Sequence, residues 1–145
     1  MSEIAIRDAQ PGDEPAVVAL IQEMAAGEGG RSPIGLAYVT AYLANPGSGI
    51  LLAEEAGRPV GLLSYSVRPD LYHADPAALV EELVVHAPQR GRGIGGALLQ
   101  AFLDRMAAQG CAEVAIAVMP DNEVAQRLYR AHGLVEEALL LERHL

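Results

Sequence analysis

A cluster of glycines and arginines in residues 89–96, Gln-Arg-Gly-Arg-Gly-Ile-Gly-Gly, constrains this chain more than any other feature of its sequence. A strand-like apolar run precedes the cluster, and a helical apolar pattern follows it. At such a junction the first N–H groups of the helix have no intrahelical partner and favour an anion. Glycines let this backbone approach a ligand without a Cβ in the way. We therefore interpret the cluster as a cradle for phosphate or pyrophosphate.

The distribution of charge supports this interpretation. The chain has 145 residues with 19 acidic and 10 basic side chains, and its net charge is −9. Such an acidic chain is a poor binder of nucleic acid or of an anionic membrane. It contains no Lys, which excludes Schiff-base chemistry. Residues 83–103 carry Arg90 and Arg92 and no acidic residue, so the one positive stretch coincides with the glycine cluster.

Length and composition predict one domain over residues 1–145, because this is a common domain size and 51% of the residues are apolar. Cys111 is the single cysteine, so the chain forms no internal disulfide and a reducing cytoplasm is expected. The N-terminus lacks the pattern of a signal peptide. The uncharged run 32–53 contains Pro33 and a turn at 45–49, so we do not expect a membrane span.

Hydrophobic periodicity and turn residues predict alternating strands and helices. The expected elements are a strand around Ile4 and Ile6, a helix at 13–27, a helix opening at Ser32 and ending near 44, a hairpin of strands 50–54 and 59–67, a loop at 69–76, a strand at 79–86, a helix from about 94 to 109, a strand at 112–118, a helix at 122–131 and a short last strand at 138–141.

One phosphate-bearing ligand that fits the glycine cluster is a dinucleotide. Gly91-x-Gly93-x-x-Gly96 matches the dinucleotide fingerprint, which would make the chain an NAD-dependent oxidoreductase. That fingerprint expects an acidic residue about 20 residues further on, for the ribose. Here residues 116–118 are apolar, and the glycine unit lies past residue 90 instead of opening the fold. The dinucleotide interpretation therefore lacks the acidic residue that should contact the ribose.

The other fit is Arg90-x-x-Gly93-x-Gly95, which resembles the acetyl-CoA-binding motif of the GNAT superfamily of N-acetyltransferases. A second segment is similar to the family's closing motif N-x-x-A-x-x-L-Y-x-x-x-G-F, with Leu for Phe, at Asn122, Ala125, Leu128, Tyr129, Gly133 and Leu134. The order of the expected elements also resembles the family over essentially the whole chain. Two spaced motifs in the same order make this resemblance specific.

The resemblance implies an α/β (α+β) fold of the GNAT type: a mixed, mostly antiparallel central sheet flanked by helices, with a splayed pair of parallel strands that holds CoA. It also implies acetyl-CoA as co-substrate. The residues it assigns to acetyl-CoA are Leu83, Val84 and Val85 along the pantetheine arm, Arg90, Gly91, Arg92, Gly93, Ile94, Gly95 and Gly96 at the pyrophosphate, and Asn122 from the following helix. Arg92 is the nearest cationic side chain for the phosphates.

Acetyl transfer needs a base for the amine, a donor for the oxyanion and an acid for the leaving thiolate. The resemblance assigns the acid to Tyr129, which is a neutral donor at pH 7. Glu81 and Glu82 are the candidate bases, and because neighbouring strand residues face opposite sides, we expect one of them to face the cleft. Similarity to polyamine acetyltransferase-like members favours Glu81, with Glu82 binding substrate or serving structure. The N–H of Val85 can serve the oxyanion.

The expected acceptor is a small cationic primary amine, because the loops 27–31 and 68–76 are acidic and aromatic, with Glu28, Asp70, Tyr72 and Asp75. We expect no metal, since the four histidines have no metal-like spacing. Nucleic acid and membranes are not expected as partners, and a homodimer is left open. The alternatives to an acetyltransferase are the NAD-dependent oxidoreductase and a noncatalytic CoA-binding module.

Overall fold

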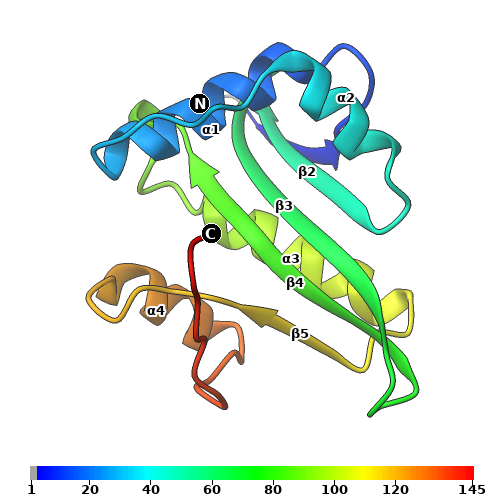
Figure 1. Cartoon of the computed structure of the whole chain (residues 1–145). Helices are drawn as coiled ribbons and strands as arrows, with labels where there is room; N and C mark the ends of the chain where they lie inside the picture. The colour runs from blue at the N-terminus through cyan, green and yellow to red at the C-terminus, as the bar shows by residue number, and fades with distance from the viewer. Residues whose placement is uncertain (1–2) are drawn as a thin grey trace.

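The structure is a computed structural model that describes residues 3–145. Within these residues, five strands form one sheet in the order β1-β2-β3-β4-β5; β1 to β4 are antiparallel neighbours, and β4 and β5 run parallel (Figure 1). This confirms the mixed, mostly antiparallel sheet expected from the sequence. The strands are β1 (Ile4–Asp8), β2 (Ser48–Glu55), β3 (Arg58–Asp70), β4 (Asp75–Val85) and β5 (Glu113–Ile116).

Helices cover both faces of the sheet (Figure 1). They are α1 (Glu14–Gly27), α2 (Leu36–Ala44), α3 (Ile94–Ala108) and α4 (Glu123–Ala131), with a short 3-10 helix, η1 (Ala87–Gln89), before α3. Leu62 packs toward α1 and α2, while its neighbour Leu63 packs toward α3. This alternation along the strands divides the core into two layers. None of the helices in the described part of the chain is long and apolar enough to cross a membrane.

Local sequence signals explain where most elements begin and end. Pro15 lies in the first turn of α1, where its missing N–H costs no hydrogen bond. Asn122 caps α4, because its side-chain oxygen accepts a hydrogen bond from the N–H of Ala125 at 3.1 Å. Gly57, with φ of +77°, closes the hairpin between β2 and β3. The predicted helices and this hairpin are confirmed, with boundaries shifted by a few residues.

The second helix begins later than predicted, at Leu36 instead of Ser32. The side chain of Gln22 holds Ser32 in an extended segment, with bonds of 2.7 Å to its carbonyl oxygen and 3.0 Å from its N–H. The Ser32 hydroxyl accepts a hydrogen bond from the N–H of Ile34 at 3.1 Å, so it organises the loop before the helix. The predicted helix start was therefore wrong by one turn.

The predicted loop at 69–76 is also shorter than expected, since β3 continues to Asp70 and β4 starts at Asp75. Pro69 and Pro76 lie opposite each other in this hairpin. Two prolines can face each other in an antiparallel ladder at a position where neither residue donates across it. The prolines thus mark a strand end and not a long loop.

The predicted last strand at 138–141 is absent from the described residues, which have no regular structure beyond α4. Leu139 and Leu141 are almost fully exposed. A strand forms only against a partner edge, and in the described chain this segment pairs with no strand. Apolar residues alone were not sufficient to predict one.

Candidate active site

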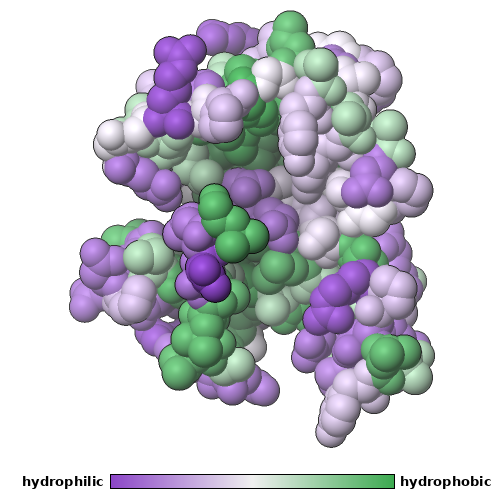
Figure 2. All heavy atoms as spheres, in the orientation of Figure 1, coloured by the Kyte–Doolittle hydropathy of each residue, from purple (hydrophilic) through white to green (hydrophobic). Residues whose placement is uncertain are grey.

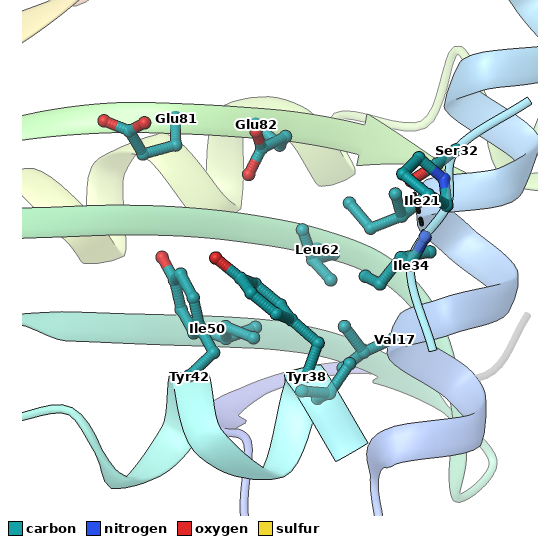
Figure 3. Close-up of a pocket in the computed structure, with 12 residues that line it drawn as sticks. Val17, Ile21, Ser32, Ile34, Tyr38, Tyr42, Ile50, Leu62, Glu81 and Glu82 are labelled. Atoms are coloured by element: carbon teal, nitrogen blue, oxygen red, sulfur yellow. Dashed lines mark hydrogen bonds between the residues drawn. The ribbon is translucent and has the colours of Figure 1, made fainter. Parts of the chain in front are cut away.

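An extra residue in β4 organises the candidate site. Opposite it in β3, Ser64 pairs with Glu82 and Tyr65 pairs with Val80, which leaves Glu81 as a β-bulge. A bulge breaks the alternation of side chains between the two faces of a sheet. As a result Glu81 and Glu82 both lie on the side of the sheet that α1 and α2 cover (Figure 3). The expectation that only one of them faces the cleft was wrong for this reason.

Two serines of β3 hold these carboxylates. The hydroxyl of Ser64, a buried residue, donates to the Glu82 carboxylate and accepts from the Glu82 N–H at 2.9 Å. The Ser66 hydroxyl donates to Oε1 of Glu81 across a longer 3.3 Å. Glu82 is therefore fixed and half-buried, whereas Glu81 is exposed and more loosely held. Sequence reasoning missed both serines, although they are the polar residues at alternate positions of an otherwise apolar strand.

Both carboxylates line a cavity of about 410 Å³ between α1, α2 and the sheet. Figure 2 shows a hollow with an apolar floor in this part of the surface. The residues that line it are Val17, Ile21, Ser32, Pro33, Ile34, Tyr38, Val39, Tyr42, Ile50, Leu62, Glu81 and Glu82. Its size lies in the range of small-molecule sites.

Two tyrosines of α2, one helical turn apart, form the wall opposite the carboxylates. The hydroxyls of Tyr38 and Tyr42 point toward the strand that carries Glu81 and Glu82 (Figure 3). The Tyr42 hydroxyl donates to the carbonyl oxygen of Tyr65 at 3.1 Å. Burial, together with the negative charges of Glu82 and Glu81, raises the pKa of Tyr42 to about 12. Tyr42 is thus a neutral donor across the whole physiological range, and sequence reasoning did not single it out.

On its other edge, β4 loses its partner beyond the bulge. β5 pairs with Ala77 to Val80 only, so the parallel strands separate where β4 continues to Val85 (Figure 1). The N–H of His86 donates to the carbonyl of Val60 in β3 at 2.8 Å. Because donors alternate along a strand, the N–H of Val85 faces the opposite edge, toward the opening between β4 and β5.

The three predicted pantetheine residues lie at the end of β4 that runs into this opening. Val84 is buried in the layer under α1 and α2, whereas Leu83 and Val85 pack on the α3 side. This edge of β4 therefore exposes the backbone groups of these residues, and not their side chains, to the opening between β4 and β5.

The glycine cluster forms the turn between β4 and α3. Gly91 and Gly93 have φ of +78° and +82°, a conformation that other residues rarely adopt. A Cβ at either position would meet no neighbouring atom, so these glycines serve the backbone conformation and not close packing. Helical hydrogen bonding begins at the N–H of Ala97, which donates to the carbonyl of Gly93 at 3.0 Å. The N–H groups before it belong to the first helical turn, which is the anion-binding end of a helix.

Both arginines of the cluster have partners within the chain. The guanidinium of Arg92 forms a two-point ion pair with Glu55 at the end of β2, which lowers the pKa of Glu55. Arg90 donates from Nε to the carbonyl oxygen of Val85 at 2.9 Å and lies 3.6 Å from a Glu23 oxygen. Arg92 keeps 23% of its side chain exposed, so its expected contact with phosphate stays a prediction.

Glu23 of α1 ties the helix to the start of the glycine turn. One of its carboxylate oxygens lies 2.5 Å from Nδ1 of His86, and the other accepts from the N–H of Ala87 at 2.8 Å. Burial opposes ionisation of Glu23, but the hydrogen bonds from His86 and Ala87 outweigh it and lower the pKa of the carboxyl. The sequence gave no signal for this contact, which joins residues 63 positions apart.

Helix α4 packs against the beginning of α3. The Leu128 side chain lies 3.7 Å from the place where a Cβ of Gly95 would be. Tyr129 is half-buried against the core layer between the sheet and α3, and burial raises the pKa of its phenol. Asn122 uses its side-chain oxygen to cap α4, so the proposed contact with the co-substrate would fall to its amide group.

Comparison with known proteins identifies relatives of this fold and site. Residues 17–134 match the model of the Acetyltransferase (GNAT) family. The chain is 31% identical over 137 residues to the L-methionine sulfoximine/L-methionine sulfone acetyltransferase of Pseudomonas aeruginosa, a match that covers 89% of this chain and 78% of the relative.

Two further proteins are similar over different extents. An L-2,4-diaminobutyric acid acetyltransferase of Nocardia farcinica is 34% identical over 86 residues, and the match covers 59% of this chain but only 42% of that relative. Among solved structures, an aminoglycoside acetyltransferase from an uncultured soil metagenomic sample superposes with a TM-score of 0.87 at 21% identity, over 98% of this chain and 96% of that chain. This last likeness is one of fold.

Proposed function

The chain belongs to the GNAT family of acetyltransferases, and from this premise we propose that it transfers an acetyl group from acetyl-CoA to a small cationic primary amine. The observation that carries the proposal is the bulge at Glu81. It turns two carboxylates into the cavity on one side of β4, while the end of the same strand presents a free edge toward β5. Acceptor and acyl donor can therefore meet across a single strand. Family membership also decides against the NAD-dependent oxidoreductase that the glycine pattern left open.

The β5 side of β4 fits acetyl-CoA. The N–H groups of the turn and of the first turn of α3 can hold the pyrophosphate, in a backbone conformation that Gly91 and Gly93 permit. Val85 is nearest the turn, so its outward N–H can pair with a pantetheine amide. The N–H of Leu83 lies two residues further along the same edge and beside Glu81, so it can bind the thioester oxygen in place of the Val85 N–H expected from the sequence. Acetyl-CoA supplies the activated acetyl carbon. Arg92 would reach the phosphates only by sharing or leaving its pair with Glu55.

In the proposed reaction, Glu81 accepts a proton from the bound ammonium, and the free amine attacks the thioester carbonyl carbon. The N–H of Leu83 stabilises the oxyanion that forms. The C–S bond breaks as Tyr129 donates its phenolic proton to the leaving thiolate. The nitrogen keeps the new C–N bond and loses its second proton as it becomes the amide, and this proton returns to the Tyr129 phenolate. Glu82, fixed by Ser64, adds a second negative charge that holds the ammonium in place.

The environment of Tyr129 suits an acid. Its phenol is half-buried, and burial raises its pKa above the ordinary value of 10. The group is therefore protonated throughout the neutral range and loses its proton only as the pH rises beyond that value.

The test is steady-state release of the CoA thiol from acetyl-CoA with a panel of primary amines. We expect turnover, and we expect Tyr129→Phe to lower kcat by roughly 100-fold with little change in either KM. Full activity in Tyr129→Phe would remove this residue from the mechanism. Acetyl-CoA that raises the melting temperature but is not turned over with any amine would instead support the noncatalytic CoA-binding alternative.

A further inference from the structure

The walls of the cavity beside β4 differ in polarity. Seven of its twelve lining residues are aliphatic or proline, and they come from α1, α2, β2, β3 and the segment before α2. Val17, Val39 and Leu62 are at most 2% exposed and lie beneath the cavity, so its accessible apolar surface comes from the partly exposed Ile21, Pro33 and Ile34. The ionisable acids, Glu81 and Glu82, are confined to the β4 side (Figure 3). A molecule that fills the cavity must therefore be polar at one end and apolar along its body.

The charges in the cavity all have one sign. Among the residues that line it in the described chain, no arginine or histidine is present, and the sequence has no lysine. The field of the carboxylates reaches across the cavity, because Glu82 and Glu81 contribute to the raised pKa of Tyr42 on the facing helix. A second negative group brought in by a ligand would meet two like charges and no cation. Burying such an unpaired charge is strongly unfavourable.

Hydrogen-bonding capacity is also scarce apart from the carboxylates. Tyr42 already donates to the Tyr65 carbonyl, and the Ser32 hydroxyl accepts from the N–H of Ile34. Apart from the carboxylates, the Tyr38 hydroxyl, the remaining Ser32 donor and the Tyr42 acceptor, the walls that residues 3–145 form offer no further side-chain hydrogen-bonding group to the many hydroxyls of a sugar. An acceptor that carries polar groups along its whole length would leave them unpaired against the aliphatic floor.

From this arrangement we infer that the acceptor is a compact primary amine with an alkyl or aryl body and no carboxylate group. Its ammonium lies at Glu81 and Glu82, and its carbon body lies on the exposed apolar surface of Ile21, Pro33 and Ile34. The inference rests on the proposed function, because it assigns the acceptor of the same site. It separates this chain from the methionine sulfoximine and diaminobutyric acid acetyltransferases named above, which are named for amino acid substrates.

The direct test compares acceptors that differ by one group: phenethylamine, L-phenylalanine and L-phenylalaninamide. L-Phenylalanine adds a carboxylate to phenethylamine, and the amide adds nearly the same bulk without the charge. We expect kcat/KM for L-phenylalanine to be at least about 100-fold below that for phenethylamine, with the amide well above the amino acid. Glucosamine and putrescine, as polar and doubly charged acceptors, are expected to fall below phenethylamine as well.

A variant at the exposed rim of the cavity sharpens this test. Tyr38→Arg places a guanidinium on the wall facing the carboxylates, and Tyr38→Gln removes the same ring without adding charge. We expect Tyr38→Arg to lower the ratio of kcat/KM for phenethylamine to kcat/KM for L-phenylalanine by about tenfold. Tyr38→Gln should leave this ratio unchanged. Because Tyr38 is 70% exposed, neither change removes a core contact.

The outcomes separate this inference from the proposed function. L-Phenylalanine used as well as phenethylamine would overturn the inference while leaving the transferase intact. If that use disappears in Arg31→Gln, the cation comes from the loop next to Ser32, and the inference about the cavity is still wrong. Glucosamine or putrescine as the best acceptor would overturn it too. Release of no thiol with any amine would overturn both the inference and the proposed function.

Discussion

The two sides of β4 are built by different means. On the side of α1 and α2, the site is made of side chains: two carboxylates, two tyrosines and an aliphatic floor. On the side of β5, it is made of backbone: the free edge that ends at Val85 and the glycine turn with its two positive φ angles. The comparison teaches that one strand can present a selective surface and a general one. In the proposed reaction, side chains would choose the acceptor, and backbone groups would hold acetyl-CoA.

The largest expected effect on catalysis lies on the side of β4 that faces α1 and α2, called here the side-chain face; the opposite edge with the glycine turn is the backbone face. Glu81→Gln is expected to lower kcat by at least 100-fold, because the amide cannot accept the proton of the ammonium. Glu82→Gln is the matched control, since Glu82 lies beside it on the same bulge but is fixed by Ser64, and we expect it to act mainly on KM for the amine. The measurement is the pH dependence of kcat for both variants.

The two carboxylates would exchange roles if the results were reversed. A Glu81→Gln enzyme with an unchanged pH–rate profile, beside a Glu82→Gln enzyme that has lost its acidic limb, would make Glu82 the base.

A smaller effect is expected on the backbone face. Gly93→Ala forces an alanine into φ near +82°, which strains the turn and displaces the N–H groups of α3. We expect KM for acetyl-CoA to rise by about tenfold while KM for the amine stays the same. Gly110→Ala is the control, because Gly110 has a similar φ of +79° but follows the far end of α3, and this variant should lose stability without losing affinity. Equal KM values for acetyl-CoA in the two variants would separate the glycine turn from co-substrate binding.

The smallest effect is expected at Arg92. Its pair with Glu55 is formed at neutral pH, because Arg92 lowers the pKa of Glu55 and the carboxylate is protonated only as the pH falls through that lowered value. Arg92→Ala should raise KM for acetyl-CoA by about three- to fivefold, since the backbone supplies the main contacts. Glu55→Gln frees the guanidinium and should leave this KM equal or lower. A higher KM in Glu55→Gln would show that Glu55 orients Arg92 instead of competing for it.

The backbone face could be predicted from the sequence, because glycines at fixed spacing between a strand and a helix indicate a tight turn with positive φ angles. Gly91, Gly93 and the start of α3 at Ile94 lie where the pattern placed them. The parallel partner strand after α3 was implied by the resemblance to the family and is confirmed. The motif around Asn122 placed α4, and the structure adds that Asn122 caps this helix.

The side-chain face could not be predicted in the same way. The sequence shows two adjacent glutamates, but a bulge depends on how β3 and β4 pair, and nothing local to Glu81 specifies that register. The contacts of Ser64 with Glu82 and of Glu23 with His86 join residues that are distant in the chain. The late start of α2 has the same cause, since Gln22 on another helix holds Ser32 in place.

The most direct test of this division is a crystal structure of the chain with CoA and phenethylamine. The account predicts the pyrophosphate at the N–H groups of residues 91–96, the pantetheine along the free edge of β4 near Val85, and the amine nitrogen at Glu81 on the other side of the strand. CoA seated between α1 and α2, in the cavity over Leu62, would contradict it.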